Sequence, residues 1–155
     1  MLRITIPNEV QKTLRRALDK AANRECGGVL MGEHVDVNHF AVRAVEVQKP
    51  GAVAYFVRRV AGAVKSIGAF CRANGNDFTR FNYLGEWHSH PHFSVKPSSR
   101  DHATMREIAM DEGVRANFVV LLIFRLNGSA LEGSAHTYLP DGSSHRSVLE
   151  LEQPR

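Results

Sequence analysis

The spacing of hydrophobic positions changes from segment to segment along the chain and indicates helices in three places. In residues 8–22 and 55–73, apolar side chains recur every three or four positions, which is typical of a helix with one buried face. Pro7 stands just before the first segment, where its missing N–H costs nothing. Residues 98–111 are the third expected helix, because Ser98 is a suitable N-cap residue.

Other segments alternate between apolar and polar residues or consist almost wholly of β-forming residues, which predicts strands. They are residues 2–6, 29–32, 35–47, 81–90, 116–126, 130–139 and, as an edge strand, 143–151. Turn-forming residues separate several of them, at Lys49-Pro50-Gly51, at 74–77 and at Asn127-Gly128. The order of elements indicates an α/β domain in which a curved, mixed β-sheet packs with about three α-helices.

Length and composition are those of one soluble globular domain. The 155 residues are 43% hydrophobic and 23% charged, so the chain is long enough to bury one core. We expect a single domain over residues 1–151 and a flexible tail over 152–155. The net charge of +4 is mild, and Lys and Arg form no long basic run, so nucleic-acid binding is not predicted.

Two features bear on the compartment in which the chain works. The longest apolar run, residues 118–124, is too short to cross a bilayer, and the N-terminus lacks the pattern of a signal peptide. Cys26 and Cys71 form no C-x-x-C pair and fit free thiols in a reducing compartment. We therefore expect a cytoplasmic protein without membrane contact.

The densest group of reactive side chains lies in residues 85–91 (GEWHSHP) and just beyond. Side chains two apart on a strand face the same side, so His88 and His90 can supply two nitrogens to one ion. Asp101 falls in the first turn of the third expected helix, from which its carboxylate can swing back towards both imidazoles. Two His and one carboxylate leave a fourth position open for water, as a catalytic zinc site requires.

Each part of this pattern also has an ordinary structural explanation. A lone H-x-H on a strand is weak evidence for a metal, and Ser98-x-x-Asp101 alone is a capping box that starts a helix. The combination H-x-H-P-x5-P-S-x2-D is far more specific, because all of its fixed positions must coincide.

The combined pattern resembles that of the JAB/MPN (JAMM) metalloproteases, in which an upstream glutamate precedes H-x-H-x7-S-x2-D. The second part is matched by His88, His90, Ser98 and Asp101. Glu25 matches the upstream glutamate, within the run ECGGVLMG, which is similar to the family's E-x-x-G-x-L-x-G segment. The resemblance covers nearly the whole chain and implies the cytidine-deaminase-like fold of the MPN domain.

The resemblance also implies a zinc-dependent peptidase or isopeptidase. One zinc ion held by His88, His90 and Asp101 activates a water molecule. Glu25 acts as general base and then returns the proton to the leaving amine. Ser98 donates a hydrogen bond to the developing oxyanion.

Neighbouring side chains allow other interpretations. Glu86 shares a strand face with the two histidines and is either a partner that orients an imidazole, a rival base or half of a salt bridge. His92 and His102 are close enough to act as substitute ligands, although we expect both at the rim. Cys26 is expected to be a buried thiol and Trp87 a core residue.

The family's substrates are ubiquitin and ubiquitin-like modifiers, which are cut after a C-terminal glycine. Residues 85–91 are similar to those of small bacterial JAB proteins encoded beside activating-like and conjugating-like enzymes, including deconjugases of antiphage CBASS operons. We therefore expect a ubiquitin-like protein or its conjugate as partner, together with such operon-encoded enzymes. A processing peptidase for a sulfur-carrier protein, an inactive binding module for a modifier and a zinc hydrolase of a small molecule stay open as alternatives.

Overall fold

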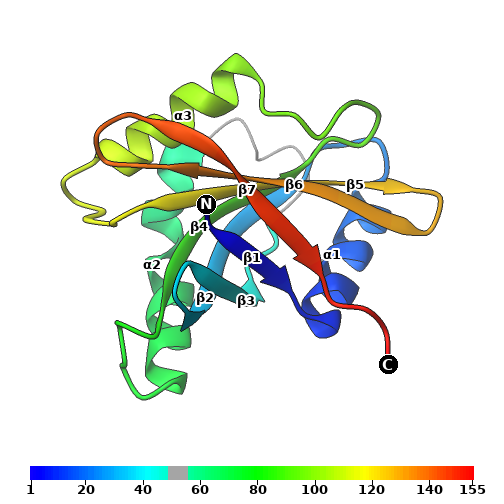
Figure 1. Cartoon of the computed structure of the whole chain (residues 1–155). Coiled ribbons are helices and arrows are strands. Elements are labelled where there is room, and N and C mark those ends of the chain that lie inside the picture. Colours follow the sequence, from blue (N-terminus) through cyan, green and yellow to red (C-terminus); the bar gives the residue numbers. More distant parts are fainter. Residues whose placement is uncertain (49–55) are drawn as a thin grey trace.

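The computed structural model describes residues 1–48 and 56–155, with side chains over 1–48 and 63–155. Figure 1 shows the arrangement of the strands and helices. In chain order they are β1 (Arg3–Ile6), α1 (Asn8–Ala21), β2 (Gly27–Asp36), β3 (His39–Val45), α2 (Phe56–Ala73), β4 (Phe81–Ser89), α3 (Ser99–Met110), β5 (Val119–Asn127), β6 (Ala130–Tyr138) and β7 (Ser144–Leu151). This order confirms the prediction, while the expected turn at Lys49-Pro50-Gly51 lies outside the described residues.

The strands close into a barrel-like sheet, which differs from the curved sheet that the sequence predicts. Their order is β1-β3-β2-β4-β5-β6-β7, and β7 pairs back to β1. The pairs β1–β3, β1–β7 and β4–β5 are parallel and the others antiparallel, so the sheet is mixed as predicted. Closure depends on β1, because Ile4 lies opposite both Phe40 of β3 and Leu149 of β7. The strand expected at an edge is therefore paired on both sides.

The hairpin of β2 and β3 turns at a different point from the one that the sequence predicts. Strands are predicted over 29–32 and 35–47, but β2 runs on through Val35, and the chain reverses at Asn38, whose φ of 55° suits a tight turn. Val35 is 47% exposed and Val37 82% exposed. These valines alternate with polar residues because they favour β-structure, although neither is buried. The alternating pattern therefore does not show where β2 ends and β3 begins.

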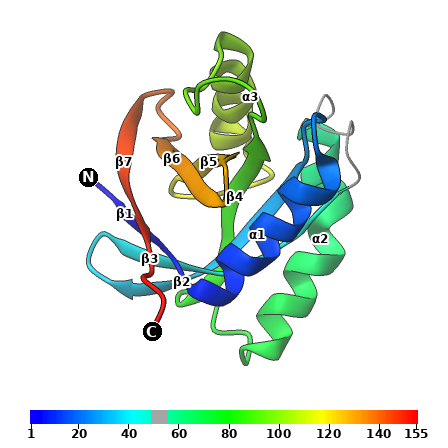
Figure 2. The same cartoon turned by 90° about the vertical axis from the view of Figure 1, so that its right-hand side faces the viewer.

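The helices divide the apolar side chains of the sheet between an inner and an outer layer. α1 packs on the inner core, and α2 and α3 cover the outer face of β2, β4, β5 and β6. Figure 2 shows α1 and α2 to the right and α3 at the top, with β1, β3 and β7 as the opposite wall. Trp87 of β4 is fully buried in the inner core, as predicted, and its indole N–H donates to the Glu46 carbonyl at 2.8 Å. Because side chains alternate along a strand, His88 faces the outer layer.

No helix within the described ranges has the length and apolar character needed to cross a bilayer.

Candidate metal centre

Three side chains with metal-binding atoms converge where β4 ends and α3 begins. His88 Nε2 lies 3.1 Å from His90 Nε2, 3.4 Å separates His88 Nε2 from Asp101 Oδ1, and 3.6 Å separates His90 Nε2 from Asp101 Oδ2. Their ligand atoms all lie within 4.8 Å of one another. Both histidines are buried, at 2% and 3% exposure. Among the described residues, this is the group that a single metal ion could join.

The start of α3 positions the carboxylate. Ser98 is the N-cap, as predicted, and its Oγ accepts a hydrogen bond from the Asp101 backbone N–H at 3.1 Å. In return, Asp101 Oδ2 accepts from the Ser98 backbone N–H at 2.7 Å, which completes a capping box. The cap therefore fixes the rotamer of Asp101 and leaves Oδ1 directed towards His88. The same arrangement therefore caps the helix and directs the carboxylate towards the two histidines.

The loop after β4 orients the second imidazole. His90 Nδ1 lies 2.7 Å from the carbonyl oxygen of Ser94, which requires the N–H at Nδ1 and leaves the lone pair of Nε2 facing the centre. The ring of Phe93 stacks on His90 at 4.2 Å, and Arg125 donates to the Phe93 carbonyl at 3.2 Å. The sequence does not reveal the Ser94 contact, because it uses a backbone carbonyl that every residue type possesses.

The electrostatics of the group keep the carboxylate ionised. Burial opposes ionisation of Asp101, but its hydrogen bonds with His88 and His90 outweigh burial and hold its pKa well below the usual range. Burial also disfavours the charged form of His90 and so lowers its pKa. The carboxylate of Asp101 and the Ser94 carbonyl raise this pKa more, so the net shift is upward. Two imidazole nitrogens around an ionised carboxylate are a donor set that suits zinc.

Two glycines at the start of β2 permit a close approach to the neighbouring backbone. A Cβ on Gly27 would come within 2.4 Å of the Trp87 carbonyl oxygen, and one on Gly28 within 1.9 Å of the Glu46 carbonyl oxygen. Only glycine fits at either position without displacement of the backbone. The ECGGVLMG run therefore brings the segment before β2 against the end of β4.

Glu25 comes to lie beside the histidines through this pairing. β2 and β4 are antiparallel, and their alignment continues beyond the strand, because Ser89 N–H donates to the Cys26 carbonyl at 2.9 Å. One residue further, Glu25 stands opposite His90, and directly opposite residues share a face. Its charge is among the smaller contributions that raise the pKa of His90 and of Cys26. Glu25 itself is half-buried.

The neighbouring side chains that the sequence singled out have other partners. Glu86 is fully buried on the outer face of β4, where one carboxylate oxygen accepts from the Tyr83 hydroxyl at 3.1 Å. His92 Nε2 lies 2.8 Å from Asn23 Oδ1, and His102 Nδ1 lies 2.8 Å from the Tyr138 hydroxyl. Within the described residues, none of the three belongs to the His88–His90–Asp101 group.

Cys26 is a buried thiol, as expected. Burial raises its pKa, a hydrogen bond with Ser89 offsets part of this effect, and the charge of Glu25 raises the pKa further. A thiol with a raised pKa is a poor nucleophile at neutral pH, so the site does not favour cysteine chemistry.

Comparisons with known proteins agree with the geometry. The family described as prokaryotic homologs of the JAB domain (Prok-JAB) matches residues 7–135. The solution structure of protein DSY2949 from Desulfitobacterium hafniense is similar over 97% of this chain and 94% of its own, at 22% identity and a TM-score of 0.65. The crystal structure of AF2198, a JAB1/MPN domain protein from Archaeoglobus fulgidus, is similar over 97% and 98%, at 15% identity and a TM-score of 0.50.

No curated protein matches the sequence significantly. The likeness to the two solved structures concerns the fold alone. The family match covers most of the chain and includes the β2 start, β4 and α3, which carry the candidate metal centre. The chain therefore belongs to the prokaryotic branch of the JAB/MPN family, which includes metallo-isopeptidases.

Proposed function

We propose that this chain is a zinc-dependent peptidase or isopeptidase that cleaves after the C-terminal glycine of a ubiquitin-like modifier. The observation that carries the proposal is the convergence of His88, His90 and Asp101, with Glu25 one residue before the Cys26–Ser89 pair that adjoins His90. A metal site alone would fit a structural ion. A free carboxylate at its side adds the base that hydrolysis requires.

The described side chains divide the chemistry between them. Bound zinc would supply a Lewis acid and lower the pKa of water. Glu25 accepts the proton of the attacking water and returns it to the leaving amine. Ser98 Oγ accepts from Asp101 N–H, which leaves its own hydroxyl proton for the oxyanion that forms on the scissile carbonyl.

The identity of the substrate rests on family resemblance and is part of the proposal. Residues 85–91 are similar to those of bacterial JAB deconjugases in antiphage operons, and the matching family is described as prokaryotic. We place the chain in a bacterial ubiquitin-like pathway, with activating-like and conjugating-like enzymes as its partners. An extended C-terminal tail ending in glycine suits an active site at the end of a strand pair.

The test combines metal content with cleavage. Wild type, His88→Ala and Asp101→Asn are purified without a metal-chelating tag, and zinc per chain is determined by elemental analysis. Each is then incubated with linear fusions in which a ubiquitin-like domain ending in Gly-Gly precedes a reporter, and products are identified by intact mass. His145→Ala, at an exposed position of β7, is the control.

We expect about one zinc in the wild type, because two histidines and one carboxylate form a single site, and cleavage directly after the terminal glycine. Both variants at the site should lose zinc and cleavage together, while His145→Ala keeps both. Tight binding of the fusion without cleavage by a zinc-loaded wild type would contradict the proposal and indicate a binding module. Cleavage confined to a sulfur-carrier precursor would keep the chemistry and replace the antiphage pathway.

A further inference from the structure

The link between α1 and β2 carries Glu25 and has a strained beginning. α1 ends at Ala21, and the C-cap residue Ala22 follows with a φ of 53° and a ψ of −110°, a region that residues with a Cβ rarely adopt. Ala22, Asn23 and Arg24 are exposed, so burial contributes little to their placement. Strain of this kind persists only where other contacts hold the backbone.

The side chains beneath the α1–β2 link also do not pack closely against it. A cavity of about 270 Å³ lies against it and is lined by Leu18 of α1, by Ala22 and by Pro91 and Leu126. Asn23 and His92 form part of its wall. Side chains therefore do not fill the space on this side of the link, and hydrogen bonds contribute to its placement.

Hydrogen bonds bracket Glu25 on both sides, and both lead to the chain that carries His90. On one side, Cys26 N–H donates to Ser89 Oγ at 3.0 Å and its carbonyl accepts from Ser89 N–H at 2.9 Å. On the other side, the His92 Nε2–H donates to Asn23 Oδ1 at 2.8 Å. Ser89 and His92 lie one residue before and two residues after His90. Within the described residues, no side-chain hydrogen bond or ion pair holds the Glu25 carboxylate itself, so its backbone must position it.

We propose that Asn23 and His92 are positioning residues, whose mutual hydrogen bond holds the Glu25 carboxylate against the metal centre. This inference rests on the proposed function in one respect, namely that Glu25 is the base. Within the described residues, neither belongs to the His88–His90–Asp101 group. Loss of the bond leaves the upstream half of the link to the backbone bond from Arg24 N–H to the Ala21 carbonyl at 3.0 Å. The segment is then less firmly tied to the chain that carries His90, and the base spends less time within reach of the water.

Activity measurements with paired variants test the proposal. Asn23→Ala and His92→Ala each remove the bond, and misplacement of a catalytic group by about 1 Å can cost as much as 100-fold in rate. We therefore expect kcat to fall by about 10- to 100-fold, with KM and zinc content unchanged. Asn23→Asp keeps the acceptor, and His92→Gln keeps an N–H donor at nearly the same place, so each should recover most of the rate.

The double variant Asn23→Ala/His92→Ala should be no slower than either single one, because both lose the same bond. Asn74→Ala is the matched control, since it removes an Asn side-chain bond of 2.8 Å to the Phe70 carbonyl in α2, away from the site. Additive losses in the double variant would contradict the proposal. So would wild-type kcat in both alanine variants when Glu25→Ala is inactive.

A second readout does not depend on activity. Amide hydrogen exchange at Arg24 and Cys26, whose N–H groups donate to the Ala21 carbonyl and to Ser89 Oγ, is followed by NMR on the zinc-loaded protein. It should accelerate in Asn23→Ala and His92→Ala and return to the wild-type rate in Asn23→Asp and His92→Gln. Unchanged exchange in the alanine variants overturns the proposal, and so does loss of zinc from them, because the bond would then support the ligands. If the wild type cleaves no fusion, the proposed function fails, while exchange still decides whether the bond holds the link.

Discussion

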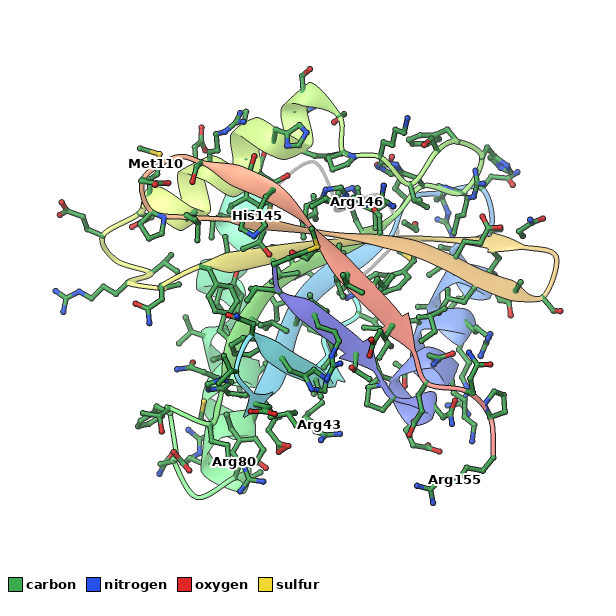
Figure 3. All side chains as sticks on the ribbon, viewed as in Figure 1. Arg43, Arg80, Met110, His145, Arg146 and Arg155 are labelled. Carbon is green, nitrogen blue, oxygen red and sulfur yellow. The ribbon has the colours of Figure 1, made fainter. Side chains whose placement is uncertain are left out.

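At each end of the β2–β4 pair, a carboxylate lies between two basic side chains, but the chemistry of these basic partners differs. At one end, Glu33 is buried, and its carboxylate forms ion pairs with the guanidinium groups of Arg43 at 3.0 Å and Arg80 at 3.4 Å. Figure 3 shows both arginines at the lower end of the molecule, away from α3 at the top. At the other end, Asp101 is surrounded by two imidazoles. Each carboxylate is balanced by two basic side chains, so charge alone does not distinguish the clusters.

The chemistry of the basic partners makes the difference. Guanidinium groups stay protonated and offer only donors, so the Glu33 cluster is a closed ion pair that ties β2 to β3 and to the start of β4. Imidazoles lose their proton near neutral pH and then offer lone pairs. The cluster at Asp101 can therefore exchange protons for a metal, and the cluster at Glu33 cannot.

The largest effect should come from neutralising each carboxylate in turn. Asp101→Asn removes one of three ligands and should abolish zinc binding and cleavage. Glu33→Gln should keep about one zinc per chain and lose only stability, by about 1–3 kcal/mol for weakened bonds to charged partners. Elemental analysis and urea unfolding measure both. Zinc loss in Glu33→Gln without unfolding would remove the distinction between the two ends.

The next effect separates the metal ligands from the base within the upper cluster, which comprises His88, His90, Asp101 and the neighbouring Glu25. Glu25→Ala should keep the fold and the zinc but lower kcat by about 10²–10⁴-fold, the usual contribution of a general base. Zinc analysis together with turnover of the Gly-Gly fusion measures it. Near-normal turnover would transfer the role of base to Glu86, although that carboxylate is buried and already accepts from Tyr83.

A smaller effect should come from Ser98. Ser98→Ala removes an oxyanion donor and should slow kcat by about 10²–10³-fold. It also removes the helix cap, at about 1 kcal/mol of unfolding free energy. Ser98→Gly separates the two roles, because glycine is a tolerable N-cap but has no hydroxyl. Normal turnover in a folded Ser98→Gly protein would confine Ser98 to capping.

The sequence predicts the upper cluster well because its logic is local. The period of two places His88 and His90 on one face, and the capping box places Asp101 in the first turn of α3. Ser98 therefore appears at its predicted place, and the order of strands and helices does as well. Glu25 required the family resemblance, since a lone glutamate before two glycines has no distinctive pattern of its own.

The remaining features depend on which segments pair with one another, which alternation does not specify. The closure of β1 on β7 joins residues about as far apart as the chain allows. The Glu33–Arg43–Arg80 cluster and the Asn23–His92 bond join side chains whose types are common on any surface. Periodicity identifies the buried face of a strand, but not the neighbour that covers it.

The smallest effect concerns the pH at which the upper cluster releases zinc. Imidazole binds metal only without its proton, so protons and zinc compete for His90. Burial lowers the pKa of His90, but Asp101, the Ser94 carbonyl and the charge of Glu25 raise it above its usual 6.5. Zinc affinity should therefore decline as the pH falls through this raised pKa, so the decline begins on the alkaline side of 6.5.

Competition with a chelator between about pH 5.5 and 8, a window around the ordinary pKa of histidine, measures the decline. Glu25→Gln removes one of the charges that raise the pKa, so its midpoint should move to lower pH. Glu33→Gln, at the far end of the same strand pair, should leave the midpoint unchanged. An unshifted midpoint in Glu25→Gln would mean that the carboxylate lies too far from His90 to act on it, and the assignment of Glu25 as base would lose its geometric support.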